Sequence, residues 1–275
     1  MRRPLGLILA LGLAPALGAC SSDVSPSQKA VSVTEDHLGD IRSGELSLRL
    51  LASTADATPD RGVGFALQGQ FAVSSDVGSL PVADLRYTRI TGATRRSTRF
   101  ISTGRRAFAE VDGRIVPLND DDVNDMRVRG GKAAGKGGLE GLDLTKWFDD
   151  AEIADGSPVD GAATERITGT VDPVAALNDL LSLSLRFGAS EQESPRTLSG
   201  GSADRVRDAV SSATAELVTG KTDRLLRQLQ VEIVMKPDAD QEKLRSALGD
   251  LVGTRLEFIL DVSKLNSPVN VAEPR

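Results

Sequence analysis

Alternation of apolar and polar residues is the feature that most constrains the fold of this chain. In the segment GELSLRL, Leu46, Leu48 and Leu50 are separated by polar or charged residues. A side-chain period of two is typical of a β-strand with one buried face. The same pattern recurs in the segments GFALQGQFAV, VADLRYTRI, RSTRFIS, RRAFAEV, AATERITGTV, LQVEIVM and RLEFILDV. These segments predict a meander of antiparallel strands with one apolar and one polar face, and DGR at 112–114 predicts a hairpin turn between Val111 and Ile115.

The intervening stretches have a period near 3.6 and predict helices. Asp172-Pro173 combines a helix N-cap with a proline at the first helical position, and the predicted helix runs to about Phe187. Further helices are predicted over Lys29–Ile41, Ala203–Thr219 and Asp240–Leu251, a helical turn in LDLTKWFDDAEI, and a flexible loop over residues 119–141. The predicted fold class is α+β, a single curved antiparallel β-sheet (an open half-barrel) with helices covering its concave apolar face.

The N-terminus has the layout of an export signal. Two arginines precede an apolar run that is too short to span a bilayer, and small residues follow it. Leu17-Gly18-Ala19-Cys20 resembles a bacterial lipobox, in which the cysteine is acylated and becomes the first residue of the mature chain. We therefore expect a signal peptide at 1–19, a lipidated tether at 20–28 and a folded domain at 29–275, held by acylated Cys20 at the extracytoplasmic face of the cell membrane.

The net charge and the residue content reduce the number of function classes that fit this chain. The formal net charge is −6, and no basic, aromatic-studded stretch occurs, so nucleic acid is not an expected partner. His37 is the only histidine and Cys20 the only cysteine, which leaves no Ser-His-Asp arrangement and too few ligands for zinc. We expect a binding protein without metal or cofactor rather than an enzyme.

Three C-terminal segments carry a family resemblance. WFDDAEI, ITGTVDPVAALNDLL and LEFILDVSKLNSPVNVAEP resemble the LppX/LprG-type bacterial lipoproteins of the LolA/LolB-like fold, in Trp147, in the strand–Asp172-Pro173–helix unit, and in the last strand running into Asn266-x-Pro268-Val269-x-Val271. The resemblance implies an open half-barrel whose hydrophobic cavity binds acylated lipids or glycolipids non-covalently and moves them through the envelope. The predicted helices at 203–219 and 240–251 stand outside that pattern, as additions that would lid or fill the cavity.

A candidate cavity lining follows from the apolar faces of the predicted strands and helices. It comprises Leu46, Leu48, Leu50, Phe65, Leu67, Phe71, Leu85, Tyr87, Phe100, Phe108, Trp147, Phe148, Leu177, Leu180, Leu181, Val231, Ile233, Leu256, Phe258 and Leu260. A packed core has the same composition as a cavity, so the sequence leaves both open. The leading hypothesis is a membrane-anchored lipid or lipoglycan carrier or chaperone. The alternatives are a non-enzymatic interaction or envelope-sensing lipoprotein with a protein partner and, third, a lipid or glycan hydrolase.

Overall fold

A computed structural model describes residues 24–54, 62–74, 76, 79–132, 139–186, 197–248, 251 and 253–274. The predicted signal peptide and Cys20 lie outside these residues.

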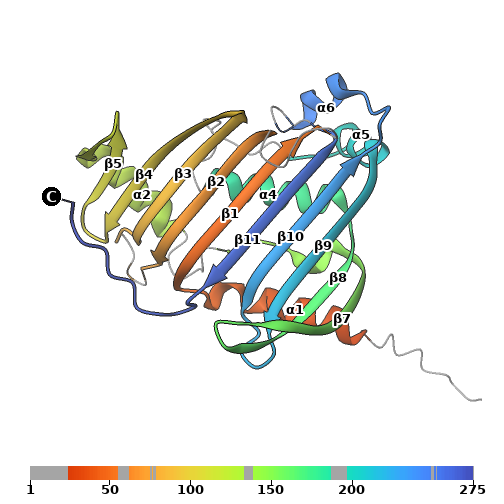
Figure 1. Ribbon diagram of the computed structural model, residues 1–275, viewed down its shortest axis with the longest axis horizontal. Coiled ribbons are helices and arrows are strands. Elements are labelled where there is room, and N and C mark those ends of the chain that lie inside the picture. Colours follow the sequence, from red (N-terminus) through yellow and green to blue (C-terminus); the bar gives the residue numbers. More distant parts are fainter. Residues whose placement is uncertain are drawn as a thin grey trace, which may run out of the picture.

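The strands form one sheet. They are β1 (Ser43–Ser53), β2 (Gly62–Ala72), β3 (Val82–Gly92), β4 (Thr94–Thr103), β5 (Ala107–Val111), β6 (Arg114–Pro117), β7 (Phe148–Val159), β8 (Ala162–Val171), β9 (Val210–Gly220), β10 (Leu226–Met235) and β11 (Arg255–Ser263). Their order is β6-β5-β4-β3-β2-β1-β11-β10-β9-β8-β7 (Figure 1). The first and last strands of the chain pair antiparallel in the middle of this 11-stranded sheet, and β6 and β7 are its open edges. The predicted antiparallel, unclosed sheet is confirmed.

The helices are α1 (Pro26–Asp36), α2 (Asp120–Lys132), α3 (Leu144–Trp147), α4 (Pro173–Arg186), α5 (Gly201–Ala209) and α6 (Gln241–Leu248), with a 3₁₀ turn η1 (Leu38–Asp40). In Figure 1, α2 and α4 lie behind the sheet. We call the face of the sheet that packs against α4 the inner face and the opposite one the outer face.

Strand register aligns one buried apolar row along the inner face. Leu48 is opposite Leu67 on one side and Leu260 on the other, and the row continues through β10, β9 and β8. Its members are Leu67, Leu48, Leu260, Leu229, Leu217 and Ile167, and all are buried. Cross-strand neighbours on one face contact each other directly, so this row ties six strands into one core.

Local capping explains where two of the helices begin. Both predicted features of α4 are present, because Asp172 Oδ1 accepts the N–H groups of Val174 at 2.7 Å and Ala175 at 3.0 Å. Helix α1 starts at Pro26, three residues before the predicted start, because Ser25 and Gln28 form a capping box and Pro26 occupies the first turn. It also ends earlier than predicted, at Asp36.

Two predicted elements are wrong. The helix predicted over 203–219 stops at Ala209, and residues 210–220 form β9 between β8 and β10. This segment is part of the sheet and neither lids nor fills a cavity. The loop predicted over 119–141 contains α2, whose start is capped by Asn119, since its Oδ1 accepts the N–H of Asp122 at 2.8 Å.

Two other predicted helical segments are present in the structure, and one of them is followed by a strand that was not predicted. The helical turn predicted around Trp147 is present as α3, but the residues after it form the edge strand β7, which was not predicted. The short helix predicted near 240–251 is present as α6. Leu244 and Leu248 of α6 are buried in the main core.

Candidate ligand-binding face

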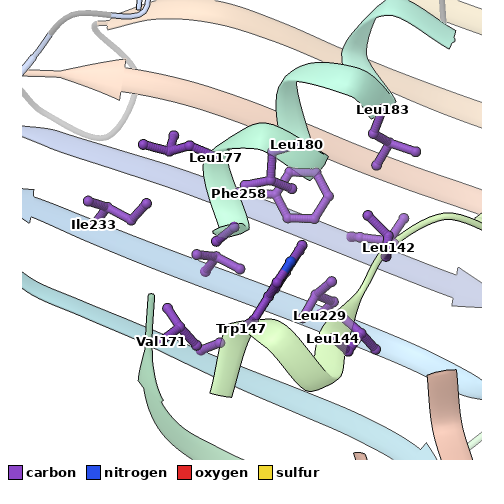
Figure 2. Packing of buried hydrophobic residues seen from close by; sticks show 14 of the residues in the cluster. Leu142, Leu144, Trp147, Val171, Leu177, Leu180, Leu183, Leu229, Ile233 and Phe258 are labelled. Carbon is purple, nitrogen blue, oxygen red and sulfur yellow. The ribbon is translucent and has the colours of Figure 1, made fainter. Parts of the chain in front are cut away.

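Most of the predicted cavity residues lie together between the inner face and the helices. The predicted residues that belong to the main hydrophobic cluster are Leu46, Leu48, Leu50, Phe65, Leu67, Trp147, Phe148, Leu177, Leu180, Val231, Ile233, Leu256, Phe258 and Leu260. Figure 2 shows Trp147 and Phe258 facing the leucines of α4. Trp147 is 0 % exposed and Phe258 1 % exposed, so the described residues close this central part of the face.

Asp179 on α4 holds the indole of Trp147. Trp147 Nε1–H donates to Asp179 Oδ2 at 2.8 Å, and the same oxygen accepts the backbone N–H of Asp143 at 2.8 Å. A buried indole N–H needs such a partner, because leaving it unpaired costs about 1–3 kcal/mol. The carboxylate thus joins α4 to the turn that carries Trp147.

At β2 and β3 the inner face is less covered. Phe71, Leu85 and Tyr87 are only partly buried and pack against the border of the main cluster. The rings of Phe65 and Tyr87 stack, with centroids 5.9 Å apart and an angle of 27° between their planes. Burial raises the pKa of the Tyr87 phenol, and the nearby charge of Arg89 opposes that shift. We call Phe65, Phe71, Leu85 and Tyr87 the aromatic margin.

The remaining predicted residues are placed differently. Phe100 is partly buried against a second, small cluster that α2 forms with β5. Phe108 is opposite Ile101 rather than Phe100, so the register puts it on the outer face, where Arg106 lies over its ring at 5.4 Å. The structure therefore does not bring Phe108 together with the inner-face residues. Leu181 is half-buried on α4.

Arginines next to the aromatic margin were not among the predicted site residues. Arg89 follows Tyr87 by two residues, and Arg96 is directly opposite Arg89 in the β3–β4 register. Both side chains therefore share the inner face with Leu85 and Tyr87. The alternation in VADLRYTRI contains this signal, since Arg89 has the same parity as Leu85 and Tyr87.

Two hollows lie on the outer face. One, of about 460 Å³, is lined by polar groups of β7–β10, including Asp150, Glu152, Glu216 and Glu232. Arg166 and Arg255 approach Glu216 and Glu232 at 3.9 and 2.9 Å. The other, of about 220 Å³, has Leu51, Ala66 and Ile90 in its lining.

Groups suited to catalysis are sparse in the described part of the chain. His37 is half-buried, and its Nδ1 donates to the carbonyl of Val33 at 2.7 Å, which is a local helix-end contact. Residues 24–54 and the other described ranges contain no group of three or more His, Cys, Asp or Glu placed to hold a metal ion. Over the same ranges, no helix is both long and apolar enough to cross a membrane.

No protein-family model matches the chain, and no curated protein matches it. Among solved structures, LprF from Mycobacterium bovis is similar, with a TM-score of 0.47 and 12 % identity over 91 % of this chain and 98 % of that one. The lipoprotein LppX from Mycobacterium tuberculosis has a TM-score of 0.43 and 14 % identity over 90 % of this chain and 98 % of its own. A LolA-superfamily protein from Nitrosomonas europaea has a TM-score of 0.22 and 7 % identity over 92 % and 96 % of the two chains. The resemblance to LppX/LprG-type lipoproteins expected from the sequence is confirmed, and at these identities it concerns the fold alone.

Proposed function

We propose that this protein is an envelope lipoprotein that binds an acylated lipid or lipoglycan against the inner face of its sheet and acts as a carrier or chaperone. The observation that supports this most directly is the aromatic margin. There the apolar inner face continues beyond the packed centre onto β2 and β3 and keeps Phe71, Leu85 and Tyr87 partly accessible.

The driving force for binding is burial of acyl chains. Each buried CH₂ contributes about 0.8 kcal/mol, so a chain lying over the margin gains several kcal/mol before any polar contact forms. Deeper entry, as in the predicted cavity, requires α4 to move away from the sheet, because Leu177 and Leu180 on α4 are 1 % and 2 % exposed. Opening and closing of this layer would then accompany loading and release.

Acylation of Cys20 is the proposed anchor. Only five residues separate Cys20 from the start of α1, and an extended segment of that length spans at most ~20 Å. Helix α1 is itself tied to the sheet, since Ser27 Oγ–H donates to the carbonyl of Ala151 at 2.7 Å. The folded unit would therefore stay close to the membrane that holds its lipid.

Native mass spectrometry of the protein purified from host membranes tests the proposal. We expect discrete added masses that organic extraction identifies as acylated lipids. Tyr87→Ala should reduce the loaded fraction, because it removes the stacked ring from the margin. Thr88→Ala changes the adjacent residue on the outer face of the same strand and should leave loading unchanged. A protein that carries no lipid, and takes up none from vesicles, would overturn the proposal.

The closed centre of the inner face supports a second candidate, a non-enzymatic interaction lipoprotein with a solid core. In that case the protein would remain free of lipid and would bind a protein partner through its surface. Cross-linking in intact cells, followed by loss of the cross-link in an outer-face variant such as Glu152→Lys, would favour this candidate.

A further inference from the structure

Arg89 and Arg96 form an unusual pair on the inner face. They are directly opposite each other on β3 and β4, and both are exposed. Like charges directly across two strands repel each other and destabilise the pairing. No ion pair to either guanidinium is formed by any residue that the structure describes.

A similar arginine pair lies on the outer face of the same β3–β4 hairpin, but there a carboxylate compensates one of the two charges. Arg86 is opposite Arg99, and Asp84 accepts two hydrogen bonds from Arg99, at 2.7 and 2.6 Å. One arginine of that pair, Arg99 on β4, is therefore matched by a carboxylate of the neighbouring strand β3. Among the described residues, the inner-face pair has no equivalent carboxylate.

Protection of a sheet edge does not account for both arginines. Strand β5 pairs with residues 100–102 of β4, so the part of β4 that carries Arg96 is a sheet edge among the described strands. Charged residues on such an edge prevent aggregation. Arg89, however, lies on β3, which is paired on both sides by β2 and β4.

The pair adjoins the aromatic margin. Arg89 is directly opposite Phe65 on β2 and shares a face with Tyr87, whose ring stacks on that of Phe65. An apolar surface thus ends at two guanidinium groups. This juxtaposition fits an amphipathic ligand with a negative group at the end of its acyl chains.

We propose that Arg89 and Arg96 bind the phosphate group of an acylated lipid whose chains lie on the aromatic margin. This inference rests on the proposed lipid-binding function and adds the chemical class of the headgroup. Guanidinium groups suit this role because their planar N–H donors match phosphate oxygens. A bound phosphate would also remove the repulsion between the two arginines. The attraction is local, since the chain as a whole carries a net charge of −6.

The test compares phosphatidic acid with diacylglycerol of the same two acyl chains, which differ only in the phosphate. Binding of each lipid to the full chain is measured by native mass spectrometry and by calorimetry in matched detergent. We expect phosphatidic acid to bind roughly tenfold more tightly, the size of two partly exposed charge pairs. The double variant Arg89→Gln/Arg96→Gln should lose this preference and still bind diacylglycerol.

A control variant has the same change in net charge. Arg86→Gln/Arg114→Gln removes two exposed arginines, one from the outer face of the same hairpin and one from the edge strand β6. It should keep the preference for phosphatidic acid. Thermal unfolding monitors folding, and the test double variant should be at least as stable as the unmodified protein because it removes a like-charge pair.

The outcomes separate the two proposals. Equal binding of both lipids, unchanged in the test double variant, overturns the phosphate site and leaves lipid binding intact. Binding of neither lipid overturns both. Inorganic phosphate provides a third probe, and if it binds as tightly as phosphatidic acid, the arginines serve free phosphate rather than a lipid headgroup.

Discussion

Asp179→Ala tests how the buried tryptophan is held. The substitution removes the acceptor of two hydrogen bonds of 2.8 Å, one from the indole of Trp147 and one from the backbone of Asp143. Trp147 is 0 % exposed, so its indole N–H depends on this acceptor within the folded protein. An unpaired buried donor costs about 1–3 kcal/mol, and the half-buried Asp143 N–H adds a smaller amount. We expect a loss of about 2–3 kcal/mol in the free energy of unfolding.

The assay is urea unfolding at pH 7 followed by tryptophan fluorescence. Trp147 is the only tryptophan of the chain, so the signal reports this site alone. Asp179→Asn keeps an acceptor oxygen and should cost about 1 kcal/mol, because a neutral acceptor forms a weaker hydrogen bond. Asp208→Ala removes an exposed carboxylate from α5 and should stay within about 0.5 kcal/mol of the unmodified protein.

A double-mutant cycle identifies the interaction responsible. In a Trp147→Phe background, followed by circular dichroism, Asp179→Ala should cost about 1 kcal/mol or less, because the indole donor is already gone. The same full cost in both backgrounds would refute the hydrogen bond as the source of the stabilisation. So would an Asp179→Ala protein that unfolds at the urea concentration of the unmodified one.

Three further predictions concern other positions. Asp172→Ala removes the N-cap of α4 and should cost about 1–2 kcal/mol in unfolding experiments at neutral pH. Burial by itself raises the pKa of Asp172, but hydrogen bonds from the backbone N–H of Ala175, the guanidinium of Arg207 and the backbone N–H of Val174 together outweigh burial and lower it. The difference from Asp172→Ala should thus be constant above about pH 4 and shrink as pH falls through the lowered pKa; an equal difference at pH 2 would contradict this. Burial raises the pKa of Asp261 in the middle of β11, so ionisation opposes folding there. Asp261→Asn should raise the thermal midpoint at pH 7, with the gain disappearing at acid pH, and a lower midpoint at pH 7 would contradict it. Gly169→Val should disrupt the β7–β8 pairing, because a Cβ would lie 1.8 Å from the carbonyl oxygen of Asp150. Faster hydrogen exchange across β7 is the expected result, and exchange equal to that of the unmodified protein would argue against it.

The local sequence pattern was sufficient to predict a strand or helix where one side-chain periodicity dominated the segment. Leu46, Leu48 and Leu50 alternate with polar residues and can bury one side only as a strand, so β1 follows from the sequence. Asp172-Pro173 predicts the first turn of α4 for an equally local reason. Asn119 could have predicted α2 in the same way, as an N-cap followed by three aspartates that favour a helix N-terminus.

Where a segment fits both the helical and the strand periodicity, its neighbouring strands decide which of the two structures it forms. Val206, Val210, Ala213 and Leu217 have helical spacing, but Ala213, Ala215 and Leu217 also alternate. Residues 210–220 form backbone hydrogen bonds with β8 on one side and β10 on the other. A helix at this place would leave the facing backbone groups of β8 and β10 without these partners. Sequence spacing contains no information about those partners.

For the candidate site too, some features follow from the sequence and others only from the tertiary structure. Composition and alternation determined that an apolar sheet face exists, and they identified most of its residues. Only the tertiary structure decided that Trp147 and α4 close its centre, that Phe108 lies on the other face, and that Arg89 meets Arg96 beside the aromatic margin. The physical reason is that burial and charge pairing depend on which strands become neighbours in space. Strands β1 and β11 pair at the centre of the sheet, although they are the first and last strands in the sequence.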